Sequence, residues 1–120
     1  MRRVRLGEIA YARSGDKGSG ANVGLIAYTP QGFHYLRAAL SAARVGRFFK
    51  PLGVGKVVRY ELPNLGAFNF VLPGILAGGA SRSLRIDAQG KALGSALLEM
   101  ELEISEQDLT GCKPRRNNRP

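Results

Sequence analysis

Residues 12–22, Ala-Arg-Ser-Gly-Asp-Lys-Gly-Ser-Gly-Ala-Asn, place three glycines and a run of polar or charged side chains between two apolar segments. Glycine adopts backbone conformations with positive φ and lets another group approach the main chain closely. Short polar side chains in such a segment hydrogen-bond to nearby backbone and fix the shape of a loop. The composition therefore predicts two strands joined by a glycine-rich loop. This loop is the segment of the chain that most resembles a binding site.

The segments on either side of this loop follow strand patterns, and a helix comes next. Residues 4–11 predict a first strand with imperfect alternation, and residues 23–28 predict a strand that is buried on both faces. Between residues 33 and 49 the apolar side chains recur at helical spacing, which predicts a helix over 33–49. Ser41 can divide this helix, because a serine can cap the start of a second helical segment.

Residues 87–104 allow two interpretations at their start. Asp87 can cap a helix, or residues 87–91 can form a hairpin turn. We favour a short helix near 88–97 that leads into a strand ending at Ile104. The strand is indicated because apolar residues alternate there with glutamates, the period-2 pattern of a half-buried strand. We expect a solvated or interface face for these glutamates, which are Glu99, Glu101 and Glu103.

Two further strands, predicted over 56–62 and 67–72, complete the order of elements. After the first strand the order is βαββαβ, which is typical of a ferredoxin-like α+β sandwich. We expect helices on one face of a mainly antiparallel sheet, with an extra N-terminal strand. The length suits a single domain over residues 1–112. Residues 113–120 are basic, with two prolines and no apolar side chain, and we expect a disordered tail.

The net charge of +9 raises the question of nucleic-acid binding. Seven of the 18 basic residues lie within residues 2–5 and 113–119. Between residues 6 and 112, the remaining 11 basic residues face 9 acidic ones, so the charge gathers at the two ends. No aromatic side chain lies among the charges of the tail to stack on bases. We therefore do not expect a nucleic-acid partner, and interpret the tail as a solubilising segment; the alternative is weak, salt-sensitive contact of the basic ends with nucleic acid or an acidic partner.

Membrane insertion and secretion are also not expected. The longest apolar stretch, residues 68–77, is interrupted by Asn69, Pro73 and Gly74, so it cannot span a bilayer. The N-terminal arginines precede no signal-peptide apolar region. A single cysteine excludes an internal disulfide. These features predict a cytoplasmic protein without a membrane partner.

The glycine-rich loop matches neither standard nucleotide motif. Lys17 precedes Gly18, whereas a P-loop lysine follows its glycine, and the glycines are out of order for a dinucleotide fingerprint. Consecutive backbone N–H groups beside two basic side chains would nevertheless suit an anion. The alternative is a tight structural loop in which Asp16 hydrogen-bonds to its own backbone. The ligand-binding residues predicted in this segment are Arg13, Ser14, Gly15, Asp16, Lys17, Gly18 and Asn22.

A second polar segment with glycines covers residues 78–85. Its two arginines could clamp a carboxylate or a phosphate, and its serines could supply hydroxyl groups. The alternative is the bent start of a strand with exposed arginines. The ligand-binding residues predicted here are Gly79, Ser81, Arg82 and Arg85.

The sequence offers little for nucleophilic or metal chemistry. His34 begins a predicted helix, where a surface or capping role is typical, and Cys112 lies far from any obvious base. One histidine, one cysteine and scattered acids form no cluster with ligand spacing. Asn64 and Asn69, beside turns and aromatic residues, are expected to be structural. We predict no metal and no cofactor, and the residues leave any catalytic group unassigned.

Several of these segments, in order, resemble one known family. The blocks are Arg13-Ser-Gly-Asp-Lys-Gly with Asn22-Val-Gly, Arg59-Tyr-Glu-Leu-Pro-Asn-Leu, Asn69-Phe-Val-Leu, and the stretch from Gly79 to Lys91. Together they resemble the small C-terminal domain of the acyclic terpene utilisation protein A (AtuA) family, over roughly residues 4–104. The resemblance implies a ferredoxin-like fold. It also implies a link to bacterial catabolism of acyclic terpenes and branched acids through acyl-CoA intermediates.

The resemblance favours an accessory, ligand-binding or partner-binding domain without catalysis of its own. The ligand would be a CoA ester or another small anion, held by Arg13, Lys17, Arg82 and Arg85. The protein partner would be a second copy of the chain or a separately encoded large-domain protein, because the large N-terminal domain of the family is absent from this sequence. The alternative is a small enzyme acting on an acyl-CoA or a short carboxylic acid, with Asp16 or Lys17 as acid or base.

Overall fold

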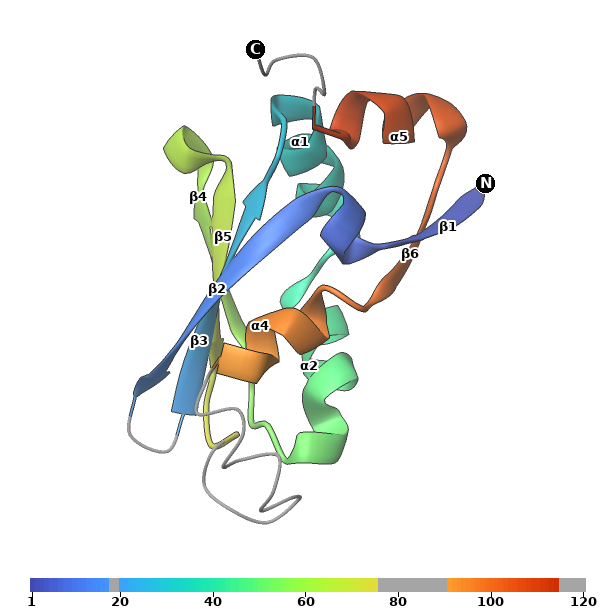
Figure 1. Ribbon diagram of the computed structural model, residues 1–120. Helices are drawn as coiled ribbons and strands as arrows, with labels where there is room; N and C mark the ends of the chain where they lie inside the picture. The colour runs from blue at the N-terminus through green and yellow to red at the C-terminus, as the bar shows by residue number, and fades with distance from the viewer. Residues whose placement is uncertain (18–19, 76–90, 115–120) are drawn as a thin grey trace.

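A computed structural model describes residues 1–17, 20–75 and 91–114 of the chain. Its main feature is a four-stranded antiparallel sheet in the order β2-β3-β5-β4 (Figure 1). A separate two-stranded antiparallel ladder, β1-β6, lies away from this sheet. The strands are β1 (Arg2–Arg5), β2 (Ala10–Lys17), β3 (Gly20–Ala27), β4 (Val58–Leu62), β5 (Ala67–Leu72) and β6 (Glu101–Ile104).

The helices lie on one side of the main sheet (Figure 1). Two of them connect β3 to β4, with β5 paired between these two strands, and one precedes β6. This arrangement confirms the α+β, ferredoxin-like fold that the order of elements predicted. The helices are α1 (Pro30–Ala39), α2 (Ala42–Phe49), α4 (Lys91–Leu97) and α5 (Glu106–Cys112), with short 3-10 turns η1 (Leu6–Glu8), η2 (Lys50–Leu52) and η3 (Pro63–Leu65).

Local capping explains where the two connecting helices begin. The Thr29 hydroxyl accepts a hydrogen bond from the Gly32 N–H at 2.9 Å, and Pro30 occupies the first position of α1. The Ser41 hydroxyl accepts from the Arg44 N–H at 3.0 Å and starts α2. The division of the predicted 33–49 helix at Ser41 is therefore confirmed.

The prediction of a glycine-rich loop over residues 12–22 is wrong for most of this segment. The structure continues β2 to Lys17 and starts β3 at Gly20, with eight cross-strand residue pairs between them. Backbone hydrogen bonds to a partner strand hold the hairpin together, so residues of low strand propensity are accommodated there. Only residues 18–19 separate the two strands, and they lie outside the described residues.

The core lies between the helices and one face of the main sheet. Alternate residues of β3 and β5 point to this covered face, as the period of two requires. The Phe33 ring of α1 stacks on Phe68 of β5, with 4.8 Å between the ring centroids. The sheet's largest contribution to the core consists of Val23, Leu25, Phe68, Phe70 and Leu72, all fully buried.

The two ends of the chain differ from the expected topology. The segment predicted as one N-terminal strand is divided by η1 into β1 and β2. β2 pairs with β3 at the edge of the main sheet, and the last strand, β6, pairs with β1. The predicted alternation of β6 is confirmed, because Leu102 and Ile104 are buried while the glutamates between and before them are exposed.

Helix α5 was not predicted from the sequence. Ser105 caps it by accepting a hydrogen bond from the Asp108 N–H at 3.0 Å. Its buried residues, Leu109 and Cys112, are three apart and belong to the core. Burial raises the pKa of the Cys112 thiol, and the nearby Asp108 carboxylate raises this pKa further. The thiol is therefore neutral and unreactive at neutral pH, as expected of a buried cysteine.

This raised pKa predicts a loss of stability at high pH. An unfolded chain releases the thiol proton near the ordinary pKa of 9.0, whereas the folded chain retains the proton to higher pH. Because the folded state then binds more protons, the free energy of unfolding should fall as pH rises above about 9. Urea unfolding of wild type and Cys112→Ala between about pH 8 and 10 measures this, with Cys112→Ala expected to lose less stability over the range. Parallel pH profiles for the two proteins would contradict the assignment.

Candidate functional site

The main sheet has a second face, turned away from the helices, which we call the open face. Strand register gives it three rows: Tyr11–Ile26–Ala67–Leu62, Arg13–Gly24–Asn69–Tyr60 and Gly15–Asn22–Val71–Val58. Antiparallel sheets commonly present polar side chains to water on the face that is not covered. Most positions of these rows are instead apolar, aromatic or glycine.

Exposed apolar side chains gather on this open face. Tyr60, in the middle row on the edge strand β4, is 54% exposed, and the rings of Tyr11 and Tyr28 lie together, with 5.4 Å between their centroids. Apart from Met1, every large hydrophobic residue that is exposed in the described part of the chain lies on the open face or at its end: Tyr11, Tyr28, Val58, Tyr60, Leu62 and Leu65.

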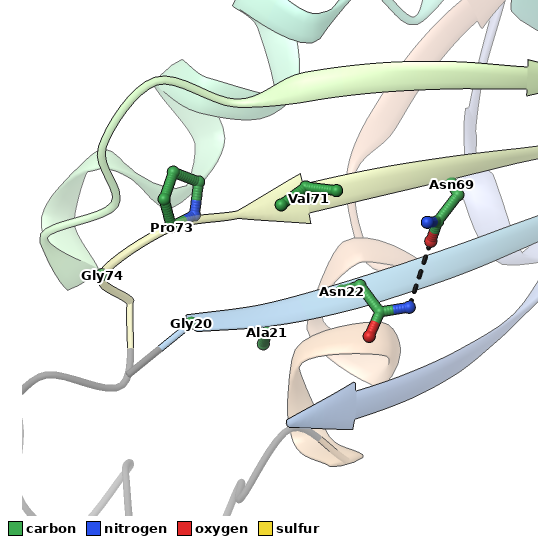
Figure 2. A pocket seen from close by; sticks show the side chains of 7 residues that line it. All are labelled: Gly20, Ala21, Asn22, Asn69, Val71, Pro73 and Gly74. Carbon is green, nitrogen blue, oxygen red and sulfur yellow. Dashed lines mark hydrogen bonds between the residues drawn. The ribbon is translucent and has the colours of Figure 1, made fainter. Parts of the chain in front are cut away.

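A polar group interrupts the apolar surface between β3 and β5. The Asn22 side-chain N–H donates to the Asn69 side-chain oxygen at 3.1 Å (Figure 2). Arg13 and Asn69 flank Gly24, which has no side chain to separate them. A hollow of about 490 Å³ opens beside the two asparagines and is lined by Gly20, Ala21, Asn22, Asn69, Val71, Pro73 and Gly74.

The structure brings some of the predicted site residues together. Arg13, Gly15 and Asn22 share the open face, since Gly15 pairs with Asn22 and Arg13 is one row away. Ser14 belongs to the covered face, where its hydroxyl accepts a hydrogen bond from the Gly94 N–H of α4 at 2.8 Å. A Cβ at position 94 would collide with that hydroxyl, so the close approach of α4 to β2 requires glycine there.

The other predicted site residues are not tested by the structure. Asp16 and Lys17 belong to the last residues of β2. The remaining residues lie outside the described part of the chain, so their grouping with Arg13 stays a prediction; they are Gly18, Gly79, Ser81, Arg82 and Arg85. Asn69, which the sequence suggested was structural, shares the open face with Arg13 and Asn22. The only sequence feature that could have marked Asn69 as a site residue is that it is the one polar residue of an otherwise apolar strand.

The matching family model is described as the AtuA ferredoxin-like domain, and it covers residues 4–103. This chain belongs to that family. The match confirms the resemblance seen in the sequence. It makes the chain a domain of a terpene utilisation system. No curated protein and no solved structure matches the chain.

Other chemistry-bearing residues of this AtuA ferredoxin-like domain lie away from the open face. His34 is exposed on α1, and Cys112 is buried in α5. The glutamates near β6 form exposed ion pairs with arginines of β1, Arg3 with Glu101 and Glu103, and Arg5 with Glu99. Within residues 1–17, 20–75 and 91–114, no three His, Cys, Asp or Glu residues lie close enough to hold a metal ion. No described helix is long and apolar enough to cross a membrane.

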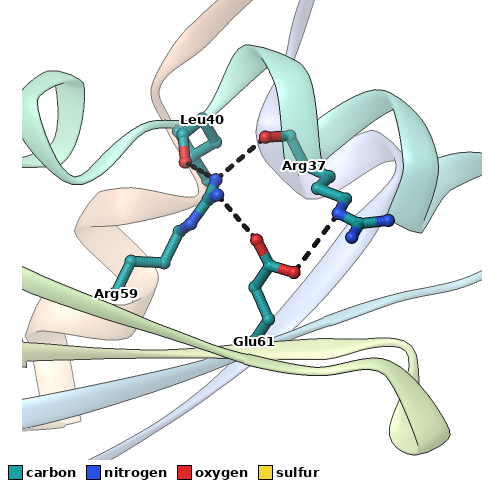
Figure 3. Close-up of polar contacts among 4 residues, drawn as sticks. All are labelled: Arg37, Leu40, Arg59 and Glu61. Carbon is teal, nitrogen blue, oxygen red and sulfur yellow. Dashed lines mark hydrogen bonds and ion pairs between the residues drawn. The ribbon is translucent and has the colours of Figure 1, made fainter.

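The family-matching block at residues 59–65 contributes a structural cluster on the covered side of β4 (Figure 3). Arg59, only 18% exposed at its side chain, donates to the carbonyl oxygens of Arg37 and Leu40 at 3.0 and 2.9 Å. These carbonyls lie at the C-terminal end of α1, where no further turn of helix satisfies them. Arg59 also pairs with Glu61 at 2.9 Å and lies over the Phe68 ring. One side chain thus fixes α1 to β4.

Replacing Arg59 should therefore destabilise the domain. Arg59→Met keeps much of the side-chain volume but leaves two helix carbonyls without their charged donor. We expect a loss of about 2–3 kcal/mol in the free energy of unfolding, measured by urea denaturation. Arg37→Met is the matched control, because the Arg37 side chain is 52% exposed and its ion pair with Glu61 should contribute less than about 1 kcal/mol. Equal losses for the two variants would contradict this role of Arg59.

Proposed function

We propose that this AtuA ferredoxin-like domain is an accessory, partner-binding domain of an acyl-CoA-type catabolic system for terpenes or branched acids, without catalysis of its own. The observation that carries the proposal is the gathering of exposed apolar and aromatic side chains on the open face. Contiguous apolar patches on a soluble domain mark interaction sites, because leaving them in water is unfavourable.

The composition of the open face resembles the centre of a protein interface. Tyrosine and arginine are enriched at such centres, and lysine and acidic residues are depleted. The three rows of the open face contain Tyr11, Tyr60 and Arg13 but no lysine, aspartate or glutamate. A partner protein that binds this face would cover the exposed tyrosine rings. Its surface would also need a group that accepts hydrogen bonds from Arg13.

The charge of Arg13 indicates the chemistry of that partner. Arg13 is exposed, and no described acidic residue forms an ion pair with it. A carboxylate on the partner would best compensate the charge of Arg13 when it is covered, since a buried unpaired guanidinium is costly. We therefore infer a partner with an apolar surface that carries an acidic side chain, and we identify it with the separately encoded large-domain protein of the same family.

Mixing the chain with the large-domain AtuA protein of the same genome tests this function. Isothermal titration calorimetry should show binding, and Tyr11→Ser/Tyr28→Ser and Arg13→Glu should each weaken it by about tenfold or more. Arg47→Ser, an exposed change on α2 at the helical side, should leave the affinity unchanged. Absence of binding, or equal affinity for all variants, would overturn the proposal.

A small anionic ligand is a second candidate, favoured by the hollow beside Asn22 and Asn69. The Asn22–Asn69 hydrogen bond uses one N–H of Asn22, so the Asn22 side-chain oxygen, its second N–H and the two N–H groups of Asn69 are left for a ligand, and Arg13 lies one row away from Asn22. Amide groups and a guanidinium together suit a CoA ester, which carries both amides and phosphates.

Calorimetry with acetyl-CoA tests the ligand site. Arg13→Ala should weaken binding about tenfold and reduce its salt dependence, because it removes a charge that meets a phosphate. Asn69→Leu should weaken binding without changing the salt dependence. Arg47→Ala serves as the control for loss of an arginine elsewhere on the surface. If both site variants bind acetyl-CoA as wild type does, the site lies elsewhere.

A further inference from the structure

Strand β4 is at one edge of the main sheet in the part of the chain that the structure describes. It pairs with β5 on its inner side, and no described strand pairs with its outer side. An unpaired edge presents backbone N–H and C=O groups that can pair with another strand. Proteins commonly protect such edges with lysine, proline or inward-pointing charges. The five residues of β4, Val-Arg-Tyr-Glu-Leu, include no lysine or proline, and the two charges that point inward, Arg59 and Glu61, pair with each other at 2.9 Å.

The sequence of β4 is complementary to itself when two copies run antiparallel. With Tyr60 placed opposite Tyr60 of a second chain, Val58 lies opposite Leu62 and Arg59 lies opposite Glu61. Each pair then joins residues of the same kind or of opposite charge. We propose that two copies of this chain pair through β4 around a two-fold axis at Tyr60, forming a continuous eight-stranded sheet.

Apolar side chains on the open face favour this pairing. Val58, Tyr60 and Leu62 are 39%, 54% and 40% exposed, although they belong to a strand of the sheet. In the pairing each would gain a cross-strand neighbour at about 5 Å between Cβ atoms, the distance at which aromatic and branched side chains interact. The pairing therefore covers part of the apolar surface that the single chain exposes.

Charges on the covered face also fit the pairing. Within one chain, Glu61 forms ion pairs with Arg59 at 2.9 Å and with Arg37 at 3.2 Å (Figure 3). A second copy would bring another Arg59 opposite each Glu61 and another Glu61 opposite each Arg59, so the alternation of signs continues across the axis. Like charges directly opposite each other would oppose the pairing, and none occurs in this register.

The axis of such a dimer runs through the sheet, so both open faces lie on the same side. The outer strands, β2 of each copy, remain at the two ends, and Tyr11, Tyr28 and Arg13 are not used in the pairing. The dimer uses the β4 side of the open face and leaves the β2 side, with Tyr11, Tyr28 and Arg13, to the partner protein proposed above. Variants at Tyr60 therefore test the dimer, whereas variants at Tyr11, Tyr28 and Arg13 test the partner site.

Sedimentation velocity of the chain alone, over a series of concentrations, tests the dimer. Wild type should approach twice the chain mass of 12.9 kDa as concentration rises. Tyr60→Lys places two like charges at the axis and should remain at the single-chain mass. Tyr11→Lys puts the same charge on the open face at the far strand and should still dimerise. A wild type that stays at one chain mass overturns the proposal, as does a Tyr60→Lys variant that dimerises like wild type.

Disulfide trapping tests the register independently of variant stability. Tyr60→Cys should form a cross-linked dimer under mild oxidation, because residues opposite each other at the axis are within disulfide reach. Wild type provides the background, since its one cysteine is buried. Tyr11→Cys is the matched open-face control and should cross-link at least tenfold more slowly. Equal cross-linking at positions 60 and 11 would overturn the assigned register.

Discussion

The hairpin of β2 and β3 determines the arrangement of the rest of the molecule. Its eight cross-strand pairs place β2 directly beside β3, at the edge where the final strand of a βαββαβ order would otherwise pair. β6 therefore pairs with β1, outside the main sheet. The same hairpin fixes α4 through the hydrogen bond from Gly94 to Ser14. It also carries Arg13 and Asn22 to the open face.

The sequence predicted those elements whose pattern is local. The apolar spacing and the cap at Ser41 predicted both connecting helices, strand propensity predicted β5, and alternation predicted β6, because each signal lies within a few residues. The hairpin was misjudged because its glycines and short polar side chains have low strand propensity, whereas its pairing depends on the facing strand. Helix α5 was missed because a serine cap and two apolar residues three apart are weak signals.

In the candidate site, too, the sequence identified residues with a local signal but not the contacts between distant strands. Arg13 and Asn22 were identified as polar residues in a distinctive segment. Asn69 comes from a distant strand, and only the strand register places its side chain against Asn22. Likewise, the block containing Arg59 resembled the family by its residues, but its contacts with the end of α1 depend on tertiary structure. Sequence patterns locate the residues, whereas the register determines which of them meet.

Helix α5 has a consequence for where the domain ends. The family match stops at residue 103, yet the Thr29 hydroxyl, at the start of α1, donates to the Gly111 carbonyl at 2.7 Å. Leu109 and Cys112 complete the core beside it. The cooperative folding unit of this chain therefore extends past the segment that the family shares. The core of this chain thus depends on side chains that lie beyond the residues the family model matches.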